Sequence, residues 1–190
     1  MQRIQGRSID APLNDRGRSQ ALALSRYFRD ISIDIVVTSS LLRARQTAQP
    51  LLEQHGMRAD AYPELDEMNF GAMEGRPVEE LNGELNRLHL GWKSGDITLA
   101  PENGEHPQAV FNRADRRAMQ VIRENEGHTI LFVVHGRLIR ILLAGWLKLG
   151  LHRMHEVEHA NAAVNHLAWD GSRFKAIALN EQRHLDTVNS

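Results

Sequence analysis

The stretch at residues 129–134 constrains the fold most, because it reads Thr-Ile-Leu-Phe-Val-Val with no alternation of apolar and polar residues. A strand that is apolar at successive positions is covered on both faces, as in a parallel sheet between helices. The stretch leads through His135-Gly136 into an apolar helix predicted at residues 137–149. A β-branched strand predicted at 33–37 leads in the same way into a helix at 41–54. This repeated order predicts an α/β fold, a three-layer α/β/α sandwich with a mostly parallel sheet.

Capping and turn residues divide the rest of the chain. Asn14 is placed to cap a helix at residues 15–30, and Pro107 is placed to start another that runs to residue 126. The remaining expected elements are a strand at 58–62, an irregular acidic loop at 63–76, and a hairpin of strands at 161–169 and 173–179. We therefore expect a single domain over residues 1–190, with a small lid at about residues 78–106.

Composition narrows the classes of function. Lys and Arg number 23 against 24 Asp and Glu, so the formal net charge is −1, which argues against nucleic acid or an anionic membrane as the partner. No run approaches the roughly 18 apolar residues that a membrane helix needs. The chain has no cysteine. This excludes disulfides, thiolate metal ligands and thiol nucleophiles, and it fits a reducing, cytoplasmic location.

Both strand–helix junctions carry residues that suit an anion. In open α/β sheets, ligands collect at the carboxyl ends of strands, where helix N-termini offer N–H groups and partial positive charge. Arg43 could clamp a phosphate there, His135 ends a strand, and Gly136 allows close approach of a ligand. Taken alone, Arg43 is also compatible with a solvated helix face beside Arg45. His135 is also compatible with a partly buried histidine whose hydrogen bonds are satisfied within the protein.

The acidic loop at residues 63–75 supplies a candidate proton donor among its four carboxylates. A carboxylic acid beside bound phosphate has its pKa raised by the negative charge, which suits protonation of a leaving oxygen. From the loop alone, a solvated acidic segment is the favoured interpretation.

Two further clusters offer rival functions. A metal site is suggested by three histidines at i, i+3 and i+7 spacing, His152, His155 and His159. That segment is short and runs toward a predicted strand, so the metal interpretation is weak. A nucleic-acid patch is suggested by Arg113, Arg116 and Arg117. Acidic residues interrupt it and aromatic residues are only 5% of the chain, so a solvated helix face is favoured.

Six short motifs of the chain match known motifs of one protein family in the same order along the sequence. They are Gln5-Gly6 with residues 11–17, similar to QG…PLTERG; residues 38–48, similar to SSxLxRAxQTA; residues 65–75, similar to LxExxFGxxEG; residues 101–105, similar to GGES; residues 133–140, similar to VxHGxxIR; and residues 161–164, similar to NASV. Each motif alone has modest specificity, but together the motifs cover practically the whole chain. On these motifs the chain resembles the histidine phosphatase superfamily, or phosphoglycerate mutase-like family.

The resemblance implies a role for each matching residue. Arg43 would be a phosphate-pocket arginine. Glu67 would be the catalytic acid that protonates the leaving group and then activates water. His135 would be the second pocket histidine, touching the phosphoryl oxygens, with Gly136 beside it. The resemblance implies no metal and no organic cofactor.

One part of the family pattern is missing. The family's RHG motif ends its first, central strand and carries the histidine nucleophile, a few residues before the QG loop. Here Met1 stands four residues before Gln5, so that strand and that histidine are absent. We expect an N-terminal truncation or a late start as the first explanation, and a true pseudoenzyme as the second. Two exposed strand edges would favour association, so a homo-oligomer is among the expected states.

The resemblance implies hydrolysis of a small phosphomonoester through a phosphohistidine in full-length relatives. The chain as written would have little or no activity, because a covalent route needs its nucleophile. Mutase activity is less favoured, since relatives with that activity carry a longer lid. The alternative is a non-catalytic pseudoenzyme that binds a phosphate ligand or a protein partner. Within the lid, Leu81, Leu88 and Trp92 are expected to shape specificity.

Overall fold

The computed structural model describes residues 3–189, and a parallel sheet lies at its centre. The strands are β1 (Ile35–Ser39), β2 (Ala59–Tyr62) and β3 (Ile130–Val133). Their order is β2-β1-β3, and both pairings are parallel. In this register Val36 lies opposite Ala59 on one side and Leu131 on the other. All three strands therefore end at the same edge of the sheet.

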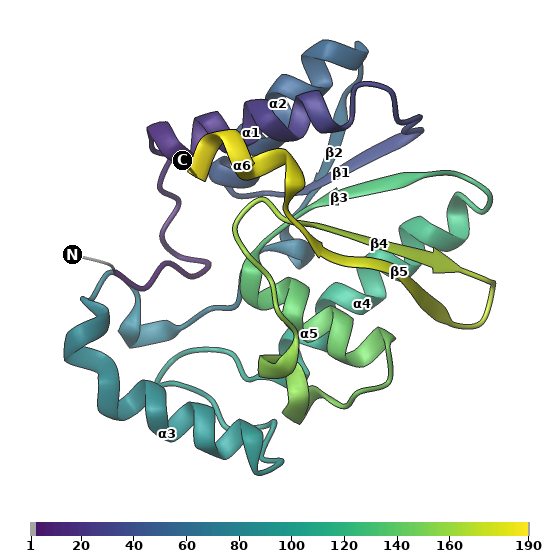
Figure 1. Ribbon diagram of the computed structural model, residues 1–190. Coiled ribbons are helices and arrows are strands. Elements are labelled where there is room, and N and C mark those ends of the chain that lie inside the picture. The colour runs from purple at the N-terminus through teal and green to yellow at the C-terminus, as the bar shows by residue number, and fades with distance from the viewer. Residues whose placement is uncertain (1–2, 190) are drawn as a thin grey trace.

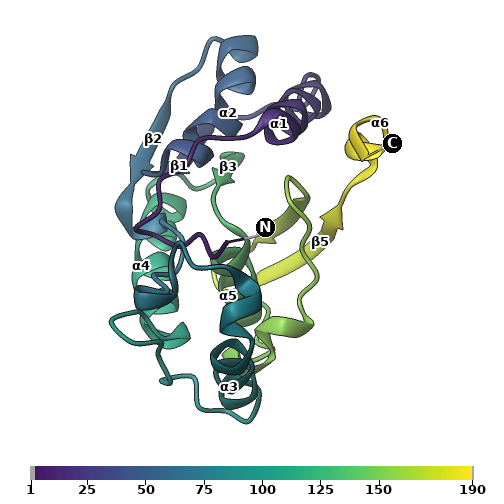
Figure 2. The same ribbon diagram turned by 90° about the vertical axis from the view of Figure 1, so that its left-hand side faces the viewer.

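Helices cover both faces of this sheet (Figures 1 and 2). The helices α1 (Asp15–Tyr27) and α2 (Leu42–His55) lie on one face, and α4 (Pro107–Glu124) and α5 (Gly136–Trp146) on the other. Val36 packs with the α1–α2 core, whereas the next residue, Val37, packs with the α4–α5 core. Successive side chains of a strand point to opposite faces, so a strand covered on both faces is apolar throughout. The predicted α/β/α arrangement is confirmed.

The C-terminal strands form a separate antiparallel pair. They are β4 (Val164–Trp169) and β5 (Phe174–Glu181). Within residues 3–189, β3 pairs only with β1, and β4 pairs only with β5. A cleft of about 1590 Å³ lies between β3 and β4, with α1, α2 and α5 along its walls. The remaining elements are α3 (Asn82–Lys93), α6 (Asp186–Asn189) and the short 3-10 turns η1 (Pro63–Leu65), η2 (Gly71–Met73), η3 (Val78–Leu81), η4 (Leu151–Glu156) and η5 (Arg183–Leu185).

Capping residues and apolar patterns predicted the ends of most helices and strands to within a few residues of their observed positions. Asn14 caps α1 as predicted, since its Oδ1 accepts from the N–H of Gly17 at 2.8 Å. The strand predicted at 33–37 instead starts at Ile35 and includes Thr38 and Ser39, which lie beyond its predicted end. The reason is tertiary, because these two residues pair with β2. Pairing with the neighbouring strand therefore sets the end of β1.

The segment at residues 78–106 is packed onto the domain rather than free of it. Leu81, Leu88 and Trp92 are 3%, 0% and 3% exposed and belong to the same apolar core as α5. The Trp92 indole N–H donates to the carbonyl of Leu99 at 2.7 Å and ties the returning loop to α3. These three side chains therefore stabilise the segment and do not line the cleft. Their expected direct role in specificity is not supported.

Within the described part of the chain, none of the helices has both the length and the apolar character needed to cross a bilayer.

Candidate active site

His135 lies two residues after the last residue of β3, Val133, and stands at the start of α5, where it is 6% exposed. Its Nε2 lies 2.6 Å from the hydroxyl oxygen of Ser39, the last residue of β1. The Ser39 oxygen also accepts from the N–H of Leu41 at 3.2 Å. The side chains of Ser39 and His135 therefore join the ends of β1 and β3 through one hydrogen bond. Ser39 was not predicted to contact His135; the signal was its place at the end of a strand parallel to β3.

The surroundings keep His135 uncharged. Burial lowers the pKa of its imidazole from 6.5 to about 3, and the positive charges of Arg43 and Arg113 act in the same direction. Removal from water disfavours the charged form of a histidine, as does a neighbouring cation. At neutral pH His135 is consequently a hydrogen-bonding group and not a cation.

Arg43 lies in the first turn of α2 and is half-buried. Its guanidinium donates to the carbonyl oxygens of Ile9 at 2.8 Å and Gly6 at 3.0 Å. Burial lowers the pKa of Arg43, whereas nearby carboxylates, Glu67 foremost, raise it. The guanidinium therefore holds the N-terminal loop while lining the same cleft as His135. The alternative interpretation of Arg43 as part of a solvated helix face is therefore wrong, although its neighbour Arg45 is exposed.

Glu67 is 8% exposed, and its carboxylate sits against the N-terminus of α5. One oxygen accepts from the N–H groups of Met68 at 2.9 Å and Leu138 at 3.0 Å, and the other from that of Arg137 at 3.0 Å. Burial raises the pKa of Glu67, and the three N–H donors oppose this rise. The helix N-terminus favours a negative charge at this place.

The expected cradle of free N–H groups is not what the structure shows. Glu67 occupies the N-terminus of α5, and the N–H of Leu42 in α2 donates to the carboxylate of Asp10 at 2.6 Å. The N–H of Ser40 donates to Asp66 at 2.8 Å. Both anion-binding helix ends are thus capped by carboxylates of the chain itself, which supply the negative charge that such sites attract.

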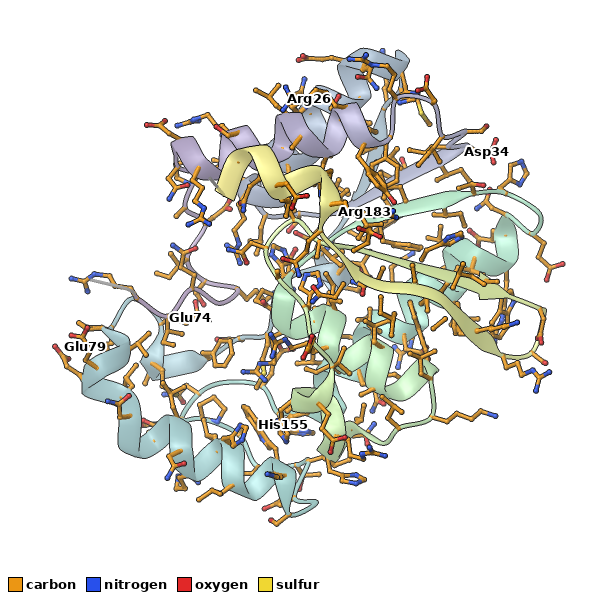
Figure 3. All side chains as sticks on the ribbon, viewed as in Figure 1. Arg26, Asp34, Glu74, Glu79, His155 and Arg183 are labelled. Carbon is orange, nitrogen blue, oxygen red and sulfur yellow. The ribbon has the colours of Figure 1, made fainter. Side chains whose placement is uncertain are left out.

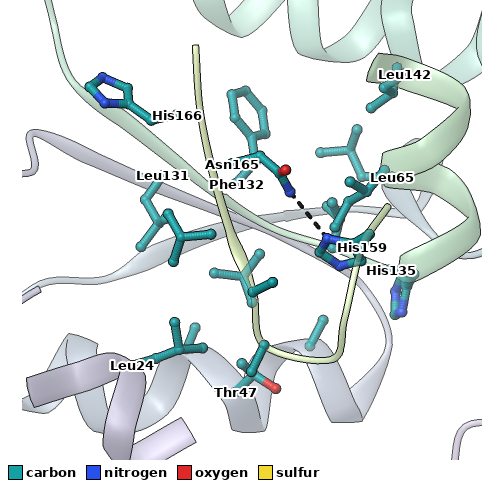
Figure 4. Close-up of a pocket in the computed structure, with 18 of the residues that line it drawn as sticks. Leu24, Thr47, Leu65, Leu131, Phe132, His135, Leu142, His159, Asn165 and His166 are labelled. Carbon is teal, nitrogen blue, oxygen red and sulfur yellow. Dashed lines mark hydrogen bonds between the residues drawn. The ribbon is translucent and has the colours of Figure 1, made fainter. Parts of the chain in front are cut away.

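Gly136 and His159 complete this end of the cleft. A Cβ on Gly136 would lie 3.9 Å from the ring of His159, an ordinary contact. Figure 4 shows the rings of His135 and His159 at the cleft and the hydrogen bond between His159 and Asn165, whose Nδ2 lies 3.1 Å from Nδ1 of the ring. Burial, assisted by the charge of Arg140, lowers the pKa of His159 to about 4. His159 was predicted only as a metal ligand, so its place in this cleft was missed.

A clamp of arginines and glutamates positions the acidic loop. Arg113 donates to the carboxylate of Glu105 at 2.7 Å and to the carbonyls of Glu64, Asp66 and Glu67 at 2.7, 2.9 and 3.0 Å. The solvated interpretation of this loop is therefore wrong, because Asp66 and Glu67 are buried. The predicted solvated helix face is also wrong for Arg113, whose side chain is part-buried and hydrogen-bonded to the acidic loop.

Two more contacts extend this clamp. Arg117 pairs with Glu64 at 2.8 Å and lies over the ring of Tyr62, so it does not belong to a free basic patch. The carboxylate of Glu74 accepts from the N–H groups of Arg7, Ser8, Ile9 and Phe70. Figure 3 shows Glu74 beside the N-terminal segment that it holds.

The three histidines of the metal hypothesis do not share a helical face. His155 lies in η4 (Figure 3), and its ring lies 4.4 Å from the ring of His89. His159 follows that turn and lines the cleft. The described residues contain no group of three potential ligands that could hold a metal ion. The helical spacing in the sequence was misleading because the segment is a short 3-10 turn.

Comparison with known proteins agrees with this geometry. The description of the histidine phosphatase superfamily, branch 1, matches residues 1–182, and the chain belongs to that superfamily. An adenosylcobalamin/alpha-ribazole phosphatase of Salmonella typhimurium is 32% identical over 70% of this chain and 66% of its own length. A probable phosphoglycerate mutase, GpmB, of Yersinia enterocolitica is 30% identical over 96% of this chain and 87% of its own length.

Solved structures show the same fold. A mycobacterial glucosyl-3-phosphoglycerate phosphatase superposes with a TM-score of 0.83 at 25% identity, over 94% of this chain and 91% of that one. The alpha-ribazole phosphatase of Shigella flexneri superposes with a TM-score of 0.81 at 28% identity, over 95% of this chain and 89% of that one. The predicted family and fold are therefore confirmed.

Proposed function

We propose that the cleft binds the phosphate of a small phosphomonoester, and that the chemistry of this lineage is phosphomonoester hydrolysis. One observation carries the proposal: Arg43, Glu67 and His135 come from three separate elements and line one end of the same cleft. They are the residues that match the motifs of the superfamily to which the chain belongs. The relatives named as phosphatases of alpha-ribazole and of glucosyl-3-phosphoglycerate support a small phosphorylated metabolite as substrate.

Each residue has a role that its surroundings suit. Arg43 uses two guanidinium N–H groups on loop carbonyls and retains others for a phosphate oxygen. His135 is neutral and offers its second ring nitrogen, Nδ1, to a phosphoryl oxygen or its proton without adding charge. Glu67, whose pKa is raised by burial, holds a proton for the leaving oxygen. To reach that oxygen, its carboxyl must give up part of its bonding to the start of α5.

We further propose that the chain as written binds phosphate with little turnover. Among the residues that the structure describes, four histidines line the cleft: His128, His135, His159 and His166. His135 matches the second pocket histidine of the family, and the Nδ1 of His159 is taken up by Asn165. Loss of a nucleophile costs on the order of a million-fold in rate. A phosphate-binding pseudoenzyme is therefore the second candidate function.

Residues 78–106 are proposed as the lid that limits substrate size, since the guanidinium of Arg137, in the first turn of α5, lies 5.6 Å from the ring centroid of Trp92 in α3. A cytoplasmic location and a small-molecule partner, without nucleic acid, complete the proposal. The engagement of Arg113 and Arg117 with the acidic loop supports the absence of a nucleic-acid patch.

Phosphate binding and p-nitrophenyl phosphate turnover test these assignments separately. Inorganic phosphate is titrated by 31P NMR into the wild type and into Arg43→Ala and His135→Ala. We expect each variant to weaken binding at least tenfold, and the exposed neighbour variant Arg45→Ala to leave it unchanged. Equal binding by Arg43→Ala would refute the phosphate site. Robust p-nitrophenyl phosphate turnover that survives His135→Ala would overturn the assigned chemistry.

A further inference from the structure

The contact between α3 and η4 combines an apolar core with one pair of histidines. Leu88 and Trp92 of α3 and Met154 of η4 are buried in the same apolar core. His89, the exposed neighbour of Leu88, places its ring centroid 4.4 Å from that of His155 in η4, with 47° between the ring planes. The contact that attaches α3 to the domain therefore contains two titratable rings.

His155 is the buried member of this pair. Its Nδ1 and Nε2 atoms are both buried, and among the described residues neither has a hydrogen-bond partner. A neutral imidazole leaves one N–H and one lone pair unpaired here, whereas an imidazolium leaves two N–H donors and a positive charge. Burial of an unpaired charge costs far more than burial of an unpaired neutral group. The docked arrangement of α3 and η4 therefore suits the neutral ring.

The neighbouring helices present positive charge to the same ring. His89 and Lys93 act on His155 from α3, and Arg137 acts on it from the first turn of α5. Burial lowers the pKa of His155, and these three groups lower it further. A like charge disfavours protonation of a histidine in the same direction as removal from water.

Two groups of η4 itself act in the opposite direction or are already engaged. The backbone of His152 raises the pKa of His155, although less than burial lowers it. The carboxylate of Glu156, the next residue in the chain, is paired with Arg153 at 2.6 Å at the exposed side of the turn. The pKa of His155 consequently remains below its ordinary value.

We propose that His89 and His155 form an acid-sensitive latch, which holds α3 against η4 while both rings are neutral and weakens when they take up protons. When α3 moves away, the ring of His155 enters water, where a histidine titrates near pH 6.5. The open form therefore binds more protons than the docked form below about pH 6.5. Acidification accordingly shifts the equilibrium toward the open form.

The apolar core sets the range over which this latch acts. Opening exposes Leu88 and Trp92, so the docked form dominates at neutral pH and acid raises a minor open population. Opening also removes Trp92 from the guanidinium of Arg137 and uncovers the start of α5. The proposal does not rest on the proposed phosphate chemistry, because neither latch histidine lines the cleft.

Amide hydrogen exchange of α3 measures the open population directly. Exchange is followed at pH 7 and pH 5 and corrected for the intrinsic effect of pH, with the amides of β1 as reporters of global unfolding. We expect α3 to exchange faster than β1 at both pH values, because it opens without global unfolding. We expect its opening equilibrium to rise about tenfold from pH 7 to pH 5.

Three variants assign this rise to the latch. His155→Phe keeps a flat ring that does not titrate, and we expect the rise to fall below about threefold. His89→Gln removes one neighbouring charge from an exposed position and should give an intermediate rise. The control His128→Asn changes an exposed histidine outside the contact and should keep the full rise. If His155→Phe does not fold, His89→Gln against His128→Asn still decides the question.

Three results would overturn the proposal. The first is exchange of α3 only together with β1, since the helix would then not open separately. The second is a full tenfold rise in His155→Phe or, where that variant does not fold, in His89→Gln. The third is loss of the rise in His128→Asn, which would place the titrating group elsewhere.

Discussion

The buried neutral His135 makes a quantitative prediction about stability and pH. In the folded chain its pKa is lowered to about 3, whereas an unfolded histidine titrates near 6.5. Between these values the unfolded chain binds a proton that the folded chain does not, so the free energy of unfolding falls as pH falls. The loss begins near pH 6.5 and continues toward pH 3. Integrated from pH 7 to pH 5, this group alone costs about 2 kcal/mol.

Urea denaturation at pH 7 and pH 5 tests this figure in the wild type and His135→Asn. The asparagine does not titrate, so we expect its pH-dependent loss of stability to be smaller by about 2 kcal/mol. Glu67 titrates in both proteins and cancels in the difference. The exposed His152→Asn should retain the full wild-type pH dependence. If His135→Asn loses as much stability as the wild type, His135 is not held neutral by its surroundings.

Three further predictions follow from contacts around the site. Glu67→Gln leaves an N–H at the start of α5 without an acceptor and should cost about 1–3 kcal/mol in urea unfolding; no loss would show that the carboxylate does not cap α5. Arg113→Met uncouples Glu105 from the acidic loop and should cost about 3 kcal/mol by the same measurement, against less than about 0.5 for the exposed Arg116→Met; equal losses would contradict the clamp. Gly71→Ala should lower the thermal midpoint more than Gly56→Ala, because both have positive φ but only a Cβ at Gly71 overlaps the carbonyl of Glu102; similar midpoints would refute that packing.

The capped helix ends change how the site must work. A phosphate that approaches α5 meets the carboxylate of Glu67, already bonded to Arg137 and Leu138. Like charges repel, so phosphate binding favours the protonated form of Glu67. The negative charge of the phosphate, which is repelled by an ionised Glu67, therefore also favours the protonated Glu67 that the proposed chemistry needs.

Much of the fold was predictable from local pattern. The unbroken apolar run at β3 and the β-branched run at β1 indicated strands covered on both faces, and Asn14 and Pro107 marked helix starts that the structure confirms. The structure brings the predicted site residues Arg43, Glu67 and His135 to one cleft. Their motifs stand at strand ends and at the start of helices, where the chain order itself dictates the position.

The sequence by itself determined the α/β class, the family and which side chains gather at the carboxyl edge, because apolar periodicity and ordered motifs are properties of neighbouring residues. Only the tertiary structure decided that Glu67 fills the end of α5, that Arg113 is a clamp and that His159 lines the same cleft as His135. It also decided that β3 and β4 stand apart with open edges. These features join residues far apart in the chain, so burial and pairing fix them and no local pattern encodes them.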